Sequence, residues 1–337
     1  MKRITSIDLF AGVGGMRLAL ERAIKKLGLN HKCKLYSEIN LYSRHTYDEN
    51  FPNTPLIKDI KSVKSEKIKK EIPDHDILLA GFPCQPFSQA GISVRNNLKR
   101  KHGFDDEEQG NLFFDILKIL DKKKPQAFLL ENVANLKIYN KGQALKKMLK
   151  CLRKNYYVPD PEILDAQDFG LAQRRKRIYI IGFLNKSGED FIYPKASLVK
   201  TKVGDFLDKY PQKKYIISDL LWESHKKRKL RNKKAGKGFG YKLTFSNDKC
   251  TNTLSSRYFK DGGECLIFRG KNKNPRLLTP KECLRLQGFP ENFKLPVSNT
   301  QGYQQAGNAV PINVVEKICL NIISYLLTKQ DIRDIAV

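Results

Sequence analysis

The strongest constraint on the fold is an apolar run at 77–79, Ile-Leu-Leu, that leads directly into an irregular loop at 80–91. Consecutive branched apolar residues are typical of a strand buried in a parallel sheet. Two prolines and two glycines in the loop prevent regular structure from continuing. Open α/β sheets carry their chemistry just past the carboxyl ends of their strands. The pattern therefore predicts an α/β fold that presents Cys84, within this loop, at a functional edge.

Cys84 has two interpretations. An intracellular cysteine is most often a small, buried apolar side chain. Prolines on both sides of Cys84 hold the loop backbone stiff, which a core-filling cysteine does not require and a positioned nucleophile does. We therefore treat Cys84 as a candidate nucleophile.

The charge of the chain indicates a polyanionic partner. Its 337 residues include 63 Lys and Arg against 35 Asp and Glu, a net charge of +28. Such an excess favours nucleic acid or an anionic membrane surface. No apolar stretch approaches the roughly 20 residues of a membrane span, and the first residues lack the apolar segment of a signal peptide. Nucleic acid, and not a membrane, is therefore the expected partner.

The number of cysteines and the chain length limit the possible cross-links, metal sites and number of domains. Seven cysteines without a C-x-x-C pair argue against both a disulfide framework and a zinc site. We expect a reduced, intracellular protein that needs no metal. The length accommodates one large α/β domain and a smaller one.

The N-terminal segment predicts a ligand-binding turn. A strand at 4–10 is followed by a glycine-rich turn at 11–15 and by a helix at 16–27 with one apolar face. Gly12 and Gly14 let a ligand approach the backbone closely, and the amino end of the helix faces that ligand. Many nucleotide-binding proteins share this pattern, and so do some purely structural turns.

The second and third predicted strands each end at an acidic residue, Glu38 and Asp59. An acid at the tip of the second strand is where a ribose diol is held. Asp59 can reach an adenine amino group, with Ile39 and Ile60 on the two sides of the ring. The alternative is that both carboxylates are solvated loop acids.

Glu131 is the second candidate for chemistry. An apolar run at 127–130 predicts another buried strand, which delivers Glu131 at its carboxyl end. A buried carboxylate without partners is costly, so Glu131 is expected to have a hydrogen-bonding task in catalysis or substrate binding. Helices are predicted between the strands at 61–70, 111–120 and 141–153.

Four consecutive cations at 174–177 lead into a predicted strand at 177–184, which follows another near 156–166. Such a run usually forms a solvated edge. Strand alternation nevertheless puts Arg175 and Arg177 on one face, next to the proposed site, where they can grip a phosphate or a substrate carbonyl.

The character of the chain changes over 185–275, where 22 Lys and Arg stand against 9 Asp and Glu, a net charge of +13. This charge and the loss of helical periodicity predict an irregular second domain that faces DNA, with a mobile basic loop at 225–238. The alternative is an exposed, flexible insertion. We expect 276–337 to return to the first domain, 1–184, and complete it.

Helix signals mark this return. Thr279 and Glu282 form a capping box, with proline at the first helical position, and Gly288 ends that helix. A tight loop at 305–311 then leads into a last helix, whose apolar stripe predicts that it packs back on the first domain.

Six separated stretches resemble motifs of the bacterial cytosine-C5 DNA methyltransferase family, both in their residues and in their order along the chain. They are DLFAGVGG at 8–15, PCQ at 83–85, ENV at 131–133, QRRKR at 173–177, RLLTPKE at 276–282 with LQGFP at 286–290, and QAGN at 305–308. Because the ordered set covers almost the whole chain, the resemblance is specific. It implies a Rossmann-like α/β domain that binds S-adenosylmethionine, and a small, irregular target-recognition domain.

The resemblance also implies roles for single residues. The target base is served by Cys84, Glu131, Arg175 and Arg177. The cofactor is lined by Phe10, Gly12, Gly14, Glu38, Ile39, Asp59, Ile60, Leu112 and Asn308. Ile39 stands where relatives often carry an aromatic residue, so stacking on adenine is expected to be weaker.

DNA contacts follow from the same resemblance. Gln85 and Ser88 look like the family's DNA-contacting positions, on a mobile loop that we expect to continue into a lid at 93–110. The pair Thr253-Leu254 resembles one that places the recognition domain on the backbone of the flipped nucleotide. Neighbouring Arg257 and Tyr258 are candidates for reading bases. The surrounding segment looks most like bacterial enzymes that methylate CC(A/T)GG.

The implied reaction methylates C5 of a cytosine flipped out of duplex DNA, through a covalent bond between Cys84 and C6. A monomer in the bacterial cytoplasm is expected, with a separate restriction endonuclease as its counterpart. Alternatives are an RNA cytosine-C5 methyltransferase on the same fold and a non-catalytic DNA-binding regulator. A nicotinamide oxidoreductase would use the glycine turn but leaves Cys84, Glu131 and the net charge unexplained.

Overall fold

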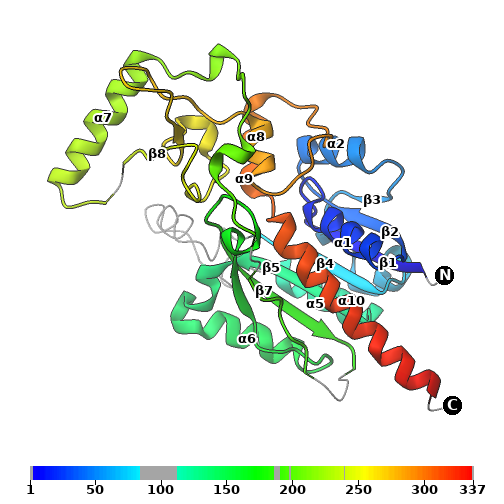
Figure 1. Cartoon of the computed structure of the whole chain (residues 1–337). Coiled ribbons are helices and arrows are strands. Elements are labelled where there is room, and N and C mark those ends of the chain that lie inside the picture. The colour runs from blue at the N-terminus through cyan, green and yellow to red at the C-terminus, as the bar shows by residue number, and fades with distance from the viewer. Residues whose placement is uncertain (1–2, 84–111, 186–189, 197–198, 239, 336–337) are drawn as a thin grey trace.

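The computed structural model describes residues 3–83, 112–185, 190–196, 199–238 and 240–335 (Figure 1). Its centre is a seven-stranded sheet in the order β3-β2-β1-β4-β5-β7-β6. The strands are β1 (Arg3–Leu9), β2 (Asn30–Ser37), β3 (Leu56–Ile57), β4 (Ile77–Gly81), β5 (Ala127–Val133), β6 (Glu162–Asp165) and β7 (Lys176–Phe183). The first five in chain order pair in parallel, whereas β7 is antiparallel to both β5 and β6. The predicted α/β fold is confirmed.

Helices cover both faces of the sheet, because strand residues alternate between two buried clusters. Leu79 and Leu129 share one cluster with α1 (Gly15–Lys26) and α10 (Ile312–Ile335). Neighbouring sheet residues point into the other cluster, which is covered by α3 (Ile68–Glu71), α5 (Leu112–Lys123) and α6 (Gln143–Leu152). The helix α10 packs along α1, so the C-terminal segment does return to the first part of the chain (Figure 1).

The capping box forms as expected. In α8 (Pro280–Arg285) the Thr279 hydroxyl accepts a hydrogen bond from the Glu282 amide at 3.1 Å, and the Glu282 carboxylate accepts from the Thr279 amide at 2.6 Å. Gly288, with a φ of 87°, follows this helix. Glu282 is also paired with Arg276, so the cap is anchored inside the protein.

Three predicted elements differ in the structure. The helix expected at 61–70 is two short 3-10 turns followed by α3, because only Ile68 and Ile60 point inward there. The strand expected near 156–166 is shorter in the structure, where it is β6, Glu162–Asp165. The loop expected at 305–311 begins inside a helix, α9 (Asn299–Asn308), which the Ser298 side chain caps.

The basic segment at 225–238 was predicted as a mobile loop, and this prediction is wrong. Most of it belongs to α7 (Asp219–Lys234), whose first turn is capped by the Ser218 hydroxyl. Lys, Arg and Leu are good helix formers, so local propensity holds this helix although it has no apolar face. His225 is its one buried residue. As Figure 1 shows, α7 projects away from the sheet.

The rest of the basic region has little regular structure, which agrees with the predicted irregularity. Two short parallel strands, β8 (Leu243–Thr244) and β9 (Leu266–Ile267), form its sheet. Its buried side chains, including Leu254 and Tyr258, share one apolar cluster with α8, α9 and α10. The basic region, 185–275, is therefore joined to the rest of the chain by a continuous apolar core.

No single helix in the described ranges has both the length and the apolar composition for crossing a membrane. The helix α9 and the first part of α10, which are bent relative to each other, reach the required length and apolar composition only when they are counted as one segment.

Candidate active site

The predicted site residues gather along one edge of the sheet. Five parallel strands end there in the order β3, β2, β1, β4, β5. The antiparallel strand β7 begins at the same edge, since its Arg177 lies opposite Val133 at the end of β5. The topology thus brings Asp59, Glu38, Phe10 and Glu131 into one row with Arg177.

Glu131 lies deep in this row. It pairs with Gly81 of β4 on one side and with Tyr179 of β7 on the other. Its carboxylate oxygen Oε1 is 3.1 Å from Nε of Arg177, and both side chains are largely buried. Burial raises the pKa of Glu131, while the guanidinium groups of Arg177 and Arg175 lower it, and burial prevails. The site thus favours a protonated carboxyl more than water does.

Arg175 has other partners than those we expected. Its side chain is 2% exposed, and its guanidinium donates to the backbone carbonyls of Leu254, Gly307 and Ala309 at 2.7–3.0 Å. These bonds commit the group to protein carbonyls, so the prediction that Arg175 grips a phosphate or a substrate carbonyl is corrected. Arg177 is the residue that forms an ion pair with Glu131.

The glycine turn is built for a ligand. Phe10 has a φ of 54° and Gly12 a φ of 54°, so the backbone turns sharply after β1. A Cβ atom at Gly12 would have no neighbour within 4 Å, and the space beside it is open. Gly14 differs, because a Cβ atom there would lie 2.4 Å from the Phe51 ring. Gly14 is therefore needed for packing at the start of α1.

Glu38 closes the other side of this turn. Its carboxylate accepts hydrogen bonds from the amides of Gly12 at 2.8 Å and Asn40 at 2.7 Å. Burial raises the pKa of Glu38, while these amide hydrogen bonds lower it. Each carboxylate oxygen has a second lone pair, so the group can still accept hydroxyls of a ribose. The geometry fits the predicted diol site.

Asp8 is a candidate that sequence reasoning missed. It is 1% exposed, and neither carboxylate oxygen has a hydrogen-bond partner among the residues the structure describes. Burial raises the pKa of Asp8 well above its ordinary value, against the opposing charge of Arg17. The available signal was an acidic residue three positions before the glycine turn at 11–15. Its lack of a partner is visible only in the tertiary structure.

The remaining cofactor candidates lie around this turn in different environments. Ile60 and Leu112 are buried, whereas Ile39 is 72% exposed and Asn308 is exposed at the end of α9. Asp59 uses Oδ1 to cap a short helix by accepting from the Lys61 amide at 2.9 Å. The second carboxylate oxygen of Asp59, Oδ2, is not the acceptor of this hydrogen bond.

The predicted DNA contacts divide into two groups. Thr253 and Arg257 are exposed, and the Thr253 hydroxyl donates to the Arg174 carbonyl at 2.6 Å. Leu254 is 1% and Tyr258 2% exposed. The Tyr258 hydroxyl donates to the Cys265 carbonyl and accepts from the Leu278 amide. The prediction that the Tyr258 side chain reads bases is therefore wrong, because this side chain belongs to the core. The Leu254 side chain is also in the core, and the predicted role of the Thr253-Leu254 pair in placing this region on the DNA backbone stays a prediction.

Cys84, Gln85, Ser88 and the segment predicted as a lid at 93–110 lie outside the described residues. The structure does describe the chain up to Pro83, which follows β4 and precedes Cys84 directly. The strand that leads to Cys84 is thus the immediate neighbour of the strand that carries Glu131.

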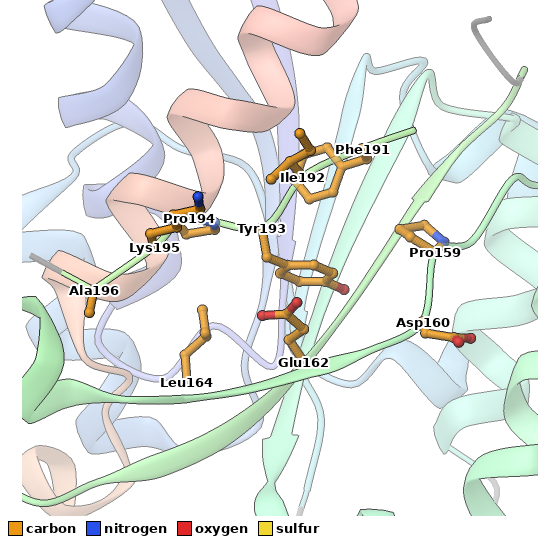
Figure 2. Close-up of a pocket in the computed structure, with 10 residues that line it drawn as sticks. All are labelled: Pro159, Asp160, Glu162, Leu164, Phe191, Ile192, Tyr193, Pro194, Lys195 and Ala196. Carbon is orange, nitrogen blue, oxygen red and sulfur yellow. The ribbon is translucent and has the colours of Figure 1, made fainter. Parts of the chain in front are cut away.

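A hollow of about 540 Å³ lies elsewhere, beside the edge strand β6. Figure 2 shows its two walls, one from Pro159 to Leu164 and the other from Phe191 to Ala196, with Tyr193 next to Glu162. None of the predicted site residues lines it. The hollow is separate from the row of strand ends described above.

Comparisons with known proteins give the class. The Entamoeba histolytica methyltransferase EhMeth superposes with a TM-score of 0.76 at 23% identity, over 97% of this chain and 99% of that structure. Schizosaccharomyces pombe Dnmt2 methyltransferase gives 0.73 at 18% identity, over 96% and 99%. The fold is that of an α/β methyltransferase.

Sequence matches give the family. Residues 4–324 match the C-5 cytosine-specific DNA methylase family. The Type II methyltransferase M.NlaX of Neisseria lactamica is 49% identical over 93% of this chain and 94% of its own length. M.DsaV of Dactylococcopsis salina, also a Type II methyltransferase, is 46% identical over 98% and 89%. The chain belongs to the C-5 cytosine-specific DNA methylase family, and it is an enzyme that methylates cytosine in DNA.

Proposed function

We propose that this enzyme transfers a methyl group from S-adenosylmethionine to C5 of a cytosine flipped out of duplex DNA, through a covalent bond between Cys84 and C6. The observation that carries the proposal is the buried Glu131 carboxyl, paired with Arg177 on the strand beside the one that leads to Cys84. Its raised pKa suits a group that must donate a proton or hydrogen bond to a ring nitrogen.

The proposed steps use these residues in order. The Cys84 thiolate adds to C6, and the electron pair displaced from the C5–C6 bond is drawn toward N3, where Glu131 supplies a proton. This makes C5 a nucleophile, which takes the methyl group. Loss of the C5 proton to a base then re-forms the double bond and expels the thiolate, while N3 returns its proton. Arg177 holds Glu131, and in this proposal it also donates to the base carbonyl O2.

S-adenosylmethionine supplies the methyl group as an electrophile. We propose that Glu38 holds its ribose and Asp59 its adenine amino group, with Phe10, Ile39, Ile60 and Leu112 against the apolar parts. The open space beside Gly12 and the unpartnered Asp8 carboxyl support this placement, because a cationic, hydroxyl-bearing ligand satisfies both. Asn308, exposed at the end of α9, closes the site from the C-terminal segment.

We further propose that 185–275 recognises DNA, while 1–184 and 276–337 carry out the chemistry. The names of the bacterial Type II relatives support a role in a restriction-modification system, with a separate endonuclease, for a monomer in the cytoplasm. CC(A/T)GG is the first sequence to test as the target.

The test of the proposed function is to express the gene in a bacterial host without cytosine methylation and map 5-methylcytosine across its genome. A single short motif methylated at C5 is the expected result. A genome without 5-methylcytosine, together with methylated host RNA, would instead support an RNA methyltransferase. Methylation at another motif would correct only the proposed CC(A/T)GG target.

Replacing Arg257 should change where the enzyme methylates. Arg257 is exposed beside Thr253. Loss of one specific base contact costs about 1–3 kcal/mol and relaxes the choice at one position of the site. Genome-wide mapping of the Arg257→Ala variant measures this. Tyr258→Phe is the control, since a buried hydroxyl in the core should affect stability and leave the motif unchanged.

Neutralising exposed lysines of α7 should weaken binding to all DNA sequences alike. Lys227 and Lys234 are exposed, and six basic residues lie in the second half of this helix, 227–234. If each contacts one phosphate, the double Gln variant should lower the slope of log affinity against log salt by about 1.8. Lys146→Gln/Lys150→Gln on α6, at the opposite end of the molecule (Figure 1), is the matched control. An equal change in both double variants would contradict a DNA-binding role for α7.

A further inference from the structure

One of the contacts between the recognition region, 185–275, and the catalytic domain is a short pairing of two backbone segments. Residues 251–254 run beside 172–175, joined by hydrogen bonds from the Thr251 amide to the Ala172 carbonyl at 2.9 Å and from the Arg174 amide to the Thr251 carbonyl at 3.0 Å. The Thr253 hydroxyl adds a third bond to the Arg174 carbonyl. This segment therefore has a fixed register on the residues that lead into β7.

The side chains of Gln173 and Arg175 form hydrogen bonds with the backbone of Leu254. The Leu254 amide donates to Oε1 of Gln173 at 3.1 Å, and the Leu254 carbonyl accepts from Nη1 of Arg175 at 3.0 Å. Both backbone polar groups of Leu254 are thus held by side chains. Gln173 is fully buried and Arg175 nearly so, so these bonds have little competition from water.

The same two side chains reach the C-terminal segment with their other ends. Nε2 of Gln173 donates to the Leu286 carbonyl at 3.2 Å. Nη2 of Arg175 donates to the carbonyls of Gly307 at 2.8 Å and Ala309 at 2.7 Å. Arg175 therefore joins the backbone of the recognition segment to the backbone on both sides of Asn308.

Close packing reinforces this junction. A Cβ atom on Gly307 would lie 2.3 Å from the Ser255 backbone carbon, so the end of α9 and the recognition segment are in direct backbone contact. A shift of one segment must move the other. Thr253, next to Leu254, and Asn308, next to Gly307, are both exposed.

We propose that Gln173 and Arg175 are positioning residues that couple DNA binding to cofactor binding. This rests on the proposed function, in which Thr253 meets the DNA backbone and Asn308 meets the cofactor. DNA bound at Thr253 fixes the backbone of Leu254. The Arg175 guanidinium transmits that position to the carbonyls of Gly307 and Ala309, the two neighbours of Asn308. Coupling between two binding sites is reciprocal, so the bound cofactor strengthens DNA binding by the same factor.

The experiment measures that factor directly. S-adenosylhomocysteine is titrated by calorimetry into the wild-type protein, alone and in the presence of a saturating duplex that contains the methylated motif found by genome mapping. Duplex affinity is measured with and without S-adenosylhomocysteine in the same way. The two ratios should agree, and a factor of about 5 to 150 is expected.

Arg175→Lys and Gln173→Glu are the test variants. Lysine keeps the charge but cannot hold three carbonyls in the planar fork of arginine, and glutamate keeps the acceptor for the Leu254 amide but loses the donor to Leu286. In both, the affinity ratio should fall toward one, while the affinity for each ligand alone stays within about threefold. Arg177→Lys, which leaves the junction intact, should lose methyl transfer and keep the wild-type ratio.

A wild-type ratio in both folded variants would overturn the proposal, as would a ratio of one in the wild-type protein. A purely structural role would lower the unfolding temperature and leave the ratio unchanged. If Arg175→Lys fails to fold, Gln173→Glu decides by the same measurement. Failure of the proposed function would look different, because the wild-type protein would then methylate no DNA.

Discussion

Cys84→Ser is expected to lose methyl transfer by about four orders of magnitude or more, because a serine hydroxyl is a far weaker nucleophile than a thiolate at neutral pH. Affinities for S-adenosylhomocysteine and for duplex DNA should stay close to those of the wild-type protein. Initial rates with radiolabelled S-adenosylmethionine measure the loss. Cys151→Ser, which changes a partly buried thiol on α6, is the control and should keep its activity.

A second measurement tests the covalent bond itself. In duplex DNA that carries 5-fluorocytosine at the target position, the fluorine cannot leave as a proton does, so the wild-type protein should remain attached to the DNA after methyl transfer. The adduct is seen as a band that survives denaturing electrophoresis. Adduct formation by purified Cys84→Ser, or substantial methyl transfer by it, would rule out Cys84 as the nucleophile.

Glu131→Gln should lower kcat by about two to four orders of magnitude, the usual loss when a general acid is removed. Glutamine keeps the shape of the side chain but cannot supply a proton to N3. Cofactor affinity should hardly change, because Glu131 faces Arg177 and Tyr179 on the β5–β7 side of the sheet. A collapse of cofactor affinity with little change in kcat would contradict the assignment.

The pH dependence of the wild-type enzyme provides a further check on Glu131. Burial raises the pKa of this carboxyl, and the protonated form is the active one in the proposed steps. The rate should therefore be highest below this pKa and fall as the pH rises through it. Glu131→Gln does not titrate, so that basic limb should disappear from its profile. An unchanged limb in the variant would place the titrating group elsewhere.

The sequence alone predicted the parts of this protein that depend on neighbouring residues. Apolar runs ending at 79 and 130 identified the strands β4 and β5, which lead to Cys84 and to Glu131. The capping box at Thr279 and the apolar stripe of α10 were also local patterns, and both were confirmed. The resemblance to cytosine-C5 DNA methyltransferases rests on short motifs of the same kind.

Only the tertiary structure decided what depends on contacts far apart along the chain. Strand alternation put Arg175 and Arg177 on one face but could not show that Arg175 reaches carbonyls 79 to 134 residues away, while Arg177 reaches Glu131. Tyr258 looked like a DNA contact because it lies close in sequence to the Thr253-Leu254 pair, yet packing against distant segments buries it. The lack of a partner for Asp8 is likewise invisible in sequence. Hydrogen bonding of buried polar groups is decided by whichever segments the fold brings together, and a local pattern carries no information about them.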